Sequence, residues 1–170
     1  MGDVYAVRLV GDVSDMTIPT RAAGMRLVVV GRVPASATRP LRQALLRPHQ
    51  RLDEVQVPGE DHPSAAWFGA IEEGEVVGTA GVMPEDRDGL ERPAWRVRAM
   101  ATVSSIRGLG IGRMLLDGCV EHAVEHGAVA IWCSARVPAA GFYRGAGFTP
   151  LGEVHDLPPI GPHIDMSLVP

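Results

Sequence analysis

Three glycines at alternate positions lie between a strand-like run and a helix-like run in residues 95–113. The stretch reads W-R-V-R-A-M-A-T-V-S-S-I-R-G-L-G-I-G-R, and the glycines are Gly108, Gly110 and Gly112. Because glycine weakens a helix, three of them at a helix start indicate close approach of a ligand to the backbone. The free N–H groups and the positive dipole end of such a helix start suit a phosphate. A flexible glycine-rich loop without a ligand is the alternative.

The glycine spacing does not match a dinucleotide-binding fingerprint. That fingerprint needs Gly-x-Gly-x-x-Gly directly after a strand, with an acidic residue about twenty residues further on. Neither Gly108 nor Gly110 begins such a frame. Arg107 and Arg113 instead place a positive charge on each side of the glycines, which favours an anion at this loop.

Two motifs, in this order, resemble those of the GNAT superfamily of N-acetyltransferases. The first is the pyrophosphate loop Arg/Gln-x-x-Gly-x-Gly/Ala, which Arg107, Gly110 and Gly112 match, and the second is A-A-G-F-Y-R-G-A-G-F at residues 139–148. The resemblance extends from Val76 to the C-terminus. It implies an α/β (mixed α+β) fold of the GNAT-like acyl-CoA N-acyltransferase type, with a central mixed sheet that is splayed at two parallel strands and flanked by helices.

In that family coenzyme A enters the gap between the splayed strands, which here would be residues 94–103 and 128–135. The resemblance therefore implies acetyl-CoA as a cosubstrate. Its expected contacts are main-chain groups of the first strand, the glycine loop and one residue of the second strand: Met100, Ala101, Thr102, Arg107, Gly108, Leu109, Gly110, Ile111, Gly112, Arg113 and Ser134.

The reaction that the resemblance implies is the attack of an amine on a thioester. It needs a neutral amine, a polarised acetyl carbonyl, for which a strand amide is suited, and a proton for the departing thiolate. Tyr143 corresponds to the tyrosine that many GNAT enzymes place beside the sulfur as a general acid. The alternative is a packed aromatic ring whose hydroxyl bonds to the backbone.

The general base is open. Some members of the family use a glutamate on the first splayed strand, but residues 94–103 contain none. A histidine is chemically suited near neutral pH. The remaining options are a loop group, a C-terminal histidine or ordered water, and the side chains concerned are Glu54, His62, His155 and His163.

The acceptor is expected beside the segment that follows the first helix, because that segment covers the acceptor site in GNAT-like folds. Here it spans residues 47–63, and Glu54, Asp61 and His62 are candidate contacts. On the strand that follows later, alternation places Arg98 on one face together with Arg96 and Met100. An arginine near the middle of a central strand needs a partner, so Arg98 is a candidate for binding a carboxylate of the acceptor.

Apolar periodicity and turn residues predict a single domain over residues 25–170, preceded by an N-terminal extension of uncertain order at residues 1–24. A helix between Pro34 and Pro48 is expected to face the core with Leu41, Ala44 and Leu45. The other expected helices are 110–126 and 138–147, and the expected strands are 26–33, 65–71, 75–82, 94–103, 128–135, 148–155 and 160–168.

Composition excludes several classes of protein. The formal charge of −4 argues against nucleic-acid binding, and every Lys/Arg position is an arginine. No apolar run is long enough to span a membrane and no signal peptide is evident, so a cytoplasmic location is expected. Cys119 and Cys133 have no metal-site spacing. His122 and His126 lie four residues apart without the H-E-x-x-H pattern, and no metal is expected.

Three functions follow from the resemblance. The first is acetyl transfer from acetyl-CoA to a primary amine of a small molecule, by direct attack in a ternary complex. The second is acetylation of a protein or peptide amine. The third is a non-catalytic coenzyme-A-binding partner subunit, which the missing glutamate keeps open. No nucleic acid and no membrane are expected as partners, and a homodimer is left open.

Overall fold

Nine strands and three α-helices are found in residues 5–13 and 26–170, which are the residues that the computed structural model describes. The strands are β1 (Tyr5–Asp12), β2 (Arg26–Arg32), β3 (Ala66–Glu72), β4 (Glu75–Pro84), β5 (Ala94–Thr102), β6 (Ala130–Arg136), β7 (Thr149–Pro150), β8 (His155–Leu157) and β9 (Gly161–Leu168). The helices are α1 (Ala35–Leu46), α2 (Ile111–Glu125) and α3 (Ala140–Gly145). Short 3-10 turns occur at Leu52–Glu54, Ser104–Ile106 and Val137–Ala139.

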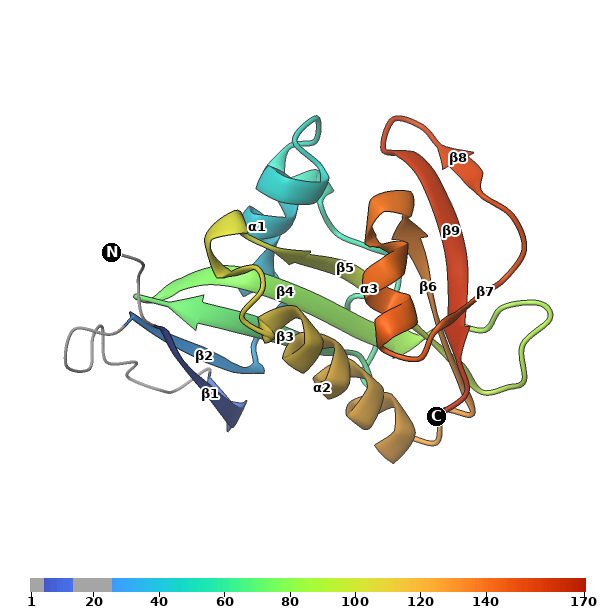
Figure 1. Cartoon of the computed structure of the whole chain (residues 1–170), viewed down its shortest axis with the longest axis horizontal. Coiled ribbons are helices and arrows are strands. Elements are labelled where there is room, and N and C mark those ends of the chain that lie inside the picture. The colour runs from blue at the N-terminus through green and yellow to red at the C-terminus, as the bar shows by residue number, and fades with distance from the viewer. Residues whose placement is uncertain (1–4, 14–25) are drawn as a thin grey trace.

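The strands form one mixed sheet (Figure 1). Their spatial order is β1-β2-β3-β4-β5-β6-β9-β7, and β8 pairs with β9. The pairs β2–β3, β3–β4 and β4–β5 are antiparallel, whereas β5 and β6, which α2 connects, are parallel. This arrangement confirms the predicted fold class. None of the helices in the described residues is long and apolar enough to cross a membrane.

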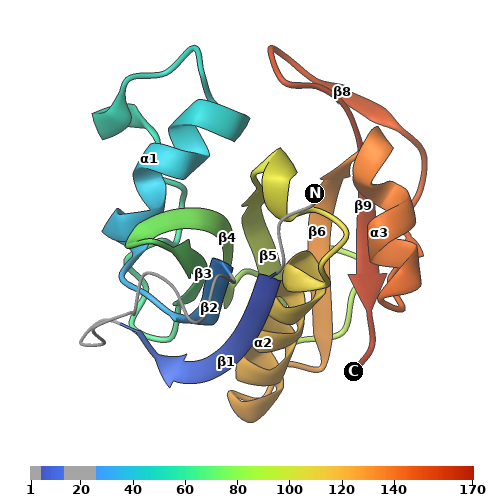
Figure 2. The same ribbon diagram turned by 60° about the vertical axis from the view of Figure 1, so that its left-hand side comes forward.

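Helices α1 and α2 cover opposite faces of the sheet (Figure 2). Side chains along a strand alternate between the faces, so Val28 and Val30 pack on the α2 side with Leu115. Val29 packs on the other side with Trp67. The two faces thus have separate apolar cores, and the larger one contains most of the buried residues of α2.

The buried face of α1 differs from the predicted one. Leu41 is buried as predicted, but the prediction for Ala44 is wrong, since Ala44 is exposed. Arg42 is buried in its place. A buried arginine is stable here because Glu60, on the following loop, supplies the opposite charge.

A bulge in β5 changes the faces predicted for its residues. The register against β4 shifts between residues 79 and 81, and Ala99 has a φ of 53°. After the bulge Ala99 packs on the α1 side and Met100 on the α2 side. The prediction that Met100 shares a face with Arg96 and Arg98 is wrong, because one extra residue reverses the alternation.

Two terminal segments also differ from expectation. The predicted strand at 148–155 is present only as β7 and the start of β8, with irregular backbone between them. Strand β1 was not expected, yet it pairs in parallel with β2 at the edge of the sheet. Tyr5–Asp12 therefore forms an edge strand of the sheet. The expected domain boundary at residues 24 and 25 lies outside the described residues.

Candidate active site

Strands β5 and β6 pair only near their N-terminal ends. The paired residues are Ala94 with Ala130, Trp95 with Ile131, and Arg96 with Trp132. Beyond these pairs the two strands diverge, and their arrows point apart in Figure 1. Main-chain groups that face such a gap have no neighbouring strand to bond, so they are available to a ligand.

The backbone of β5 directs the main-chain groups of Met100 and Thr102 toward this gap, but not those of Ala101. The Val103 N–H donates to a carbonyl of β4 at 2.9 Å. Because successive residues of a strand direct their N–H and C=O groups to opposite sides, Thr102 and Met100 direct theirs away from β4, whereas Ala101 directs its own toward β4. The Thr102 carbonyl accepts a hydrogen bond from Arg107 Nη2 at 3.3 Å.

The glycine loop presents free N–H groups beside open space. Gly108 and Gly110 have φ of 79° and 80°, which favour glycine, and a Cβ at either position would meet no atom within 4 Å. In the described backbone no carbonyl accepts a hydrogen bond from the N–H groups of residues 108–113, and the first helical bond joins the Met114 N–H to the Gly110 carbonyl. This arrangement suits a phosphate at the start of a helix.

Other residues of the loop hold it in place. Ile111 is fully buried in the core below the first turn of α2. Arg113 Nε donates to Asp117 at 2.7 Å, and its Nη1 donates to the Gly145 carbonyl of α3 at 3.2 Å. Arg107 and Leu109 are exposed at the surface of the loop. The predicted coenzyme contacts from Arg107 to Arg113 thus lie together in the loop before α2 and its first turn.

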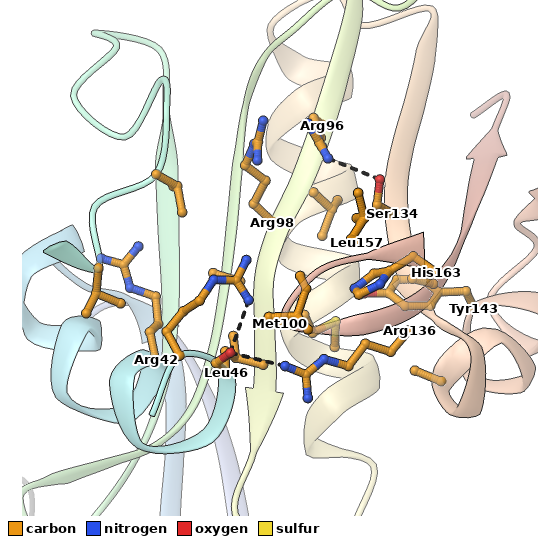
Figure 3. Close-up of a pocket in the computed structure, with 18 residues that line it drawn as sticks. Arg42, Leu46, Arg96, Arg98, Met100, Ser134, Arg136, Tyr143, Leu157 and His163 are labelled. Carbon is orange, nitrogen blue, oxygen red and sulfur yellow. Dashed lines mark hydrogen bonds between the residues drawn. The ribbon is translucent and has the colours of Figure 1, made fainter. Parts of the chain in front are cut away.

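A cavity of about 170 Å³ lies at the gap, and Figure 3 shows the side chains around it. Its walls come from α1 and the segment after it, β5, β6, the start of α3, and the β8–β9 hairpin. Among the described residues that line the cavity there is no aspartate or glutamate. Five of them are arginines: Arg42, Arg47, Arg96, Arg98 and Arg136.

Tyr143 is part of the cavity wall and is 7% exposed. Burial raises the pKa of Tyr143 well above its ordinary value of 10, and the thiols of Cys133 and Cys119 add to the rise. Its ring packs against Phe148 with the centroids 5.5 Å apart. The hydroxyl therefore stays protonated at neutral pH.

His163 also lines the cavity and is 4% exposed. Its Nδ1 lies 2.7 Å from the Gly161 carbonyl oxygen. A carbonyl only accepts hydrogen bonds, so Nδ1 carries the proton of a neutral ring and Nε2 keeps its lone pair. Of the four side chains that the sequence offered as a base, His163 is the one that the structure brings into the cavity wall with Tyr143.

The other three candidates do not line the cavity. Glu54 Oε2 accepts a hydrogen bond from the Arg51 N–H at 2.8 Å, and His62 Nδ1 accepts one from the Ser64 N–H at 3.1 Å. His155 lies beside an aspartate of β9, with the nearest nitrogen and oxygen 3.9 Å apart. All three are exposed. In this structure they are exposed side chains with local contacts, and their contact with an acceptor stays a prediction.

Arg98 and Ser134 line the cavity with their polar groups already engaged. Arg98 Nη2 and Nε donate to the Glu85 carboxylate at 2.8 and 3.1 Å, and Arg96 Nη1 donates to the same carboxylate at 2.7 Å. The Ser134 hydroxyl accepts a hydrogen bond from Arg96 Nη2 at 3.1 Å and donates to Asp165. Arg98, predicted to bind an acceptor carboxylate, is therefore already paired with Glu85, which it shares with Arg96.

Arg42 lines the cavity and is almost fully buried. It is 1% exposed, its Nη1 donates to Glu60 Oε2 at 2.7 Å, and its guanidinium lies 4.3 Å from the centre of the Trp67 ring. Arg39 donates to the other oxygen of the same carboxylate, with its Nε at 2.9 Å. Glu60 thus fixes the loop after α1 against the helix.

Sequence reasoning missed Arg47 and Arg136. Arg47 Nη1 and Arg136 Nη2 both donate to the Leu46 carbonyl, at 3.0 and 3.1 Å. Figure 3 labels Arg136 and Leu46 of this group. Burial lowers the pKa of Arg47, and the charges of Arg136 and Arg98 lower it further. One residue follows α1 and the other ends β6. Their positions at the ends of a helix and a strand were visible in the sequence as a possible sign of a functional site. Only the fold, however, brings these two ends together.

A group on the last turn of α2 could hold a metal ion. His122, Glu125 and His126 carry ligand atoms that lie within 4.8 Å of one another. His122 Nε2 lies 2.9 Å from the Ser64 carbonyl, and His126 Nδ1 lies 2.8 Å from the His122 carbonyl. None of the three lines the cavity. That the protein uses no metal stays a prediction.

The splayed sheet with its cavity is the architecture of the acyl-CoA N-acyltransferases. The N-acyl amino acid synthase FeeM from uncultured soil microbes is similar with a TM-score of 0.66 and 18% identity, covering 85% of this chain and 92% of that one. An aminoglycoside 6'-N-acetyltransferase complexed with coenzyme A is similar with a TM-score of 0.64 and 17% identity, covering 82% of this chain and 95% of that one. These likenesses show a shared fold.

Sequence similarity then gives the family. The Acetyltransferase (GNAT) family matches residues 36–148. The "Uncharacterized N-acetyltransferase YitI" of Bacillus subtilis (strain 168) is 32% identical over 142 residues, which are 82% of this chain and 95% of the relative. The chain belongs to the GNAT family of acetyltransferases, as its two motifs predicted.

Proposed function

We propose that this enzyme transfers the acetyl group of acetyl-CoA to a primary amine of a small-molecule acceptor, by direct attack in a ternary complex. The observation that carries the proposal is the cavity at the gap between β5 and β6, whose wall contains both Tyr143, protonated at neutral pH, and His163, whose Nε2 has no hydrogen-bond partner among the described residues. An acid and a base beside one cavity are what aminolysis of a thioester requires.

The residues present fit a coenzyme A molecule. The free N–H groups of residues 108–113 and the open space beside Gly108 and Gly110 suit a pyrophosphate, with Arg107 adding positive charge. The outward-directed main-chain groups of Met100 and Thr102 suit an extended amide chain that bonds as a neighbouring strand would. The coenzyme would supply the activated acetyl thioester.

The chain's own residues then provide the proton transfers. His163 Nε2 would accept a proton from the attacking amine, because its Nδ1 proton is held by the Gly161 carbonyl. A β5 amide would polarise the acetyl carbonyl. Tyr143 would donate its proton to the departing thiolate, since its raised pKa keeps the hydroxyl protonated.

A small acceptor agrees with the size of the cavity, about 170 Å³, and with the fold relatives. One of these is named for N-acyl amino acid synthesis and another for aminoglycoside acetylation, and both of those acceptors are small molecules.

Calorimetric titration with acetyl-CoA, followed by free-thiol release over a panel of amines and short peptides, tests the proposal. We expect binding of acetyl-CoA and turnover on small amines. Turnover on peptides alone would replace the small acceptor with a protein or peptide amine. Binding without turnover on any amine would favour a non-catalytic coenzyme-A-binding subunit.

A further inference from the structure

Positive charge is concentrated in the cavity although the whole chain is acidic. The formal net charge is −4, yet five arginines and no described aspartate or glutamate line the cavity. The overall field of the protein therefore does not attract anions, and any preference of this site for an anion must come from these local guanidinium groups.

Two carboxylates outside the lining form ion pairs with three of the five arginines. Glu60 pairs with Arg42 at 2.7 Å. Glu85 pairs with both Arg96 and Arg98, at 2.7 and 2.8 Å. These pairs account for the arginines of α1 and β5 and leave the two at the ends of α1 and β6.

Arg47 and Arg136 have no such partner. Among the described residues no carboxylate lies within 4.0 Å of either guanidinium. Both donate to one oxygen, the Leu46 carbonyl, so the two positive groups are held close to each other and partly buried. The lowered pKa of Arg47 reflects that burial and repulsion. An anion between the two groups would relieve the repulsion.

We infer that the acceptor amine carries a carboxylate and that Arg47 and Arg136 bind this carboxylate. The inference rests on the proposed function for the role of the cavity, but the anion site stands on the arginines themselves. A planar carboxylate can accept hydrogen bonds from two guanidinium groups at once, and each group has several N–H donors besides the one that bonds Leu46. Val55, Val57, Leu157 and Ile160 also line the cavity, so an apolar acceptor body fits beside the charge.

The test compares amino acids with their carboxamides as acceptors, for example glycine, β-alanine and leucine against glycinamide, β-alaninamide and leucinamide. We expect the parent to prefer the acid of at least one pair by about tenfold or more in kcat/KM, as a charge-assisted bidentate contact predicts. Arg47→Gln and Arg136→Gln should each lower use of that acid about tenfold while use of the amide stays within about twofold. Arg136→Lys should be intermediate, because lysine keeps the charge but loses the planar fork.

Arg92→Gln is the matched control. This substitution also removes one positive charge, but Arg92 lies on an exposed loop and does not line the cavity. It should leave kcat/KM for both the acid and the amide unchanged. Acetyl-CoA affinity, measured by calorimetry, should be the same in all variants. If the affinity for acetyl-CoA falls with the use of the acid, the arginines bind the coenzyme and the inference is overturned. Equal use of acid and amide by the parent also overturns it.

Measurements of acceptor binding distinguish a failure of this inference from a failure of the proposed function. The same acids and amides, with aminomethylphosphonate as a tetrahedral anion, are titrated into the protein saturated with coenzyme A. Selective binding of an acid that is lost in Arg47→Gln and Arg136→Gln supports the carboxylate site even if no amine is acetylated, in which case the proposed function alone fails. If no acid binds more tightly than its amide, or if the phosphonate binds more tightly than every acid, the carboxylate assignment is wrong.

Discussion

Tyr143 combines a place in the cavity wall with an environment that keeps its hydroxyl neutral. Burial is the main cause, and the neighbouring Cys133 and Cys119 thiols add to it. Both thiols are themselves held protonated, with burial raising the pKa of Cys133 to about 12. A leaving thiolate in this cavity would therefore meet a tyrosine hydroxyl that is still protonated at neutral pH.

Replacing Tyr143 with phenylalanine removes that proton and keeps the ring. Tyr143→Phe should lower turnover by about 10²–10⁴, the usual contribution of general acid–base catalysis. Binding of acetyl-CoA and the melting temperature should change little, because the packing against Phe148 is retained. Single-turnover rates, calorimetry and thermal melting on one preparation measure all three.

The pH dependence of the parent gives a second check on the same hydroxyl. Since the pKa of Tyr143 is raised above 10, turnover should not decline below pH 10 through its deprotonation. A folded Tyr143→Phe variant that turns over like the parent would show that solvent protonates the thiolate. A loss of stability with full activity in the folded fraction would show a packing role only.

Glu60 is the residue whose charge should matter most for stability. Burial favours its neutral form, but hydrogen bonds from Arg42 and Arg39 outweigh this, and the net pKa of Glu60 is lowered. Glu60→Gln leaves Arg42 buried without an opposite charge, so we expect a loss of about 3 kcal/mol in the free energy of unfolding at pH 7.

The sign of the pH effect follows from the lowered pKa. The stability that Glu60 supplies is present above the unfolded pKa, about 4.3, and is lost as the pH falls through the lower folded value. The difference between parent and Glu60→Gln should therefore be largest at neutral pH and shrink in acid. Asp53→Asn, in the exposed pair with Arg51, is the control and should change nothing measurable. A difference that does not vary with pH would contradict the assignment to the carboxylate.

The start of α2 carries the anion-binding arrangement through its backbone rather than its side chains. Gly110 is the N-cap residue of the helix and has left-handed backbone geometry. The open space beside it and the unpaired N–H groups after it are properties of the turn as a unit. A substitution at this position therefore tests the whole helix start.

Gly110→Asp and Gly110→Asn form a matched pair. Both side chains tolerate positive φ better than other residues and both are good N-caps, so their stabilities should be similar. The aspartate places a negative charge where the pyrophosphate is proposed. We expect acetyl-CoA to bind Gly110→Asp about 10- to 100-fold more weakly than Gly110→Asn. This difference in affinity should become smaller at high salt. Equal affinities would remove the phosphate-binding assignment.

Elements with strong periodicity were predictable from the sequence, and the exceptions have physical causes. The predicted helix at 110–126 and the strand at 94–103 match α2 and β5 to within one residue at each end. The bulge in β5 left no signal, because Ala99 is an ordinary residue in a left-handed conformation. The burial of Arg42 depends on Glu60, eighteen residues away, and local periodicity does not contain such a contact.

The candidate site was predictable only in part, for the same reason. The glycine loop and Tyr143 lie in motifs that local sequence displays. The choice of His163 over His155, Glu54 and His62 depends on which segments the fold brings to the gap, and so does the meeting of Arg47 and Arg136.

The edge strand β1 affects the whole sheet. It covers β2, whose Val28 and Val30 are fully buried, and Tyr5 lies under the Arg26 guanidinium with 5.3 Å to the ring centre. Without β1, the edge of β2 would expose unpaired N–H and C=O groups next to apolar side chains, a surface that promotes association between chains.

A chain that starts at Met25 should therefore be less stable than the full chain. We expect its melting temperature to fall by about 5 °C or more and its tendency to self-associate to rise. A chain that lacks only residues 1–4 is the control, because it keeps β1. Thermal melting and light scattering measure both effects. A truncated chain that melts like the parent would show that the folded domain begins near Met25.

Three residue pairs join β5 to β6. Among the described residues, this short ladder alone connects strands β1 to β5 with strands β6 to β9 in one sheet. In hydrogen-exchange terms, the parts before and after the gap can behave as two cooperative units, each opening with its own free energy. A ligand in the gap would bond to both strands and make the two units open together. Occupancy of the donor site would then set how much of the molecule opens locally, so that the empty enzyme is the form most exposed to proteolysis.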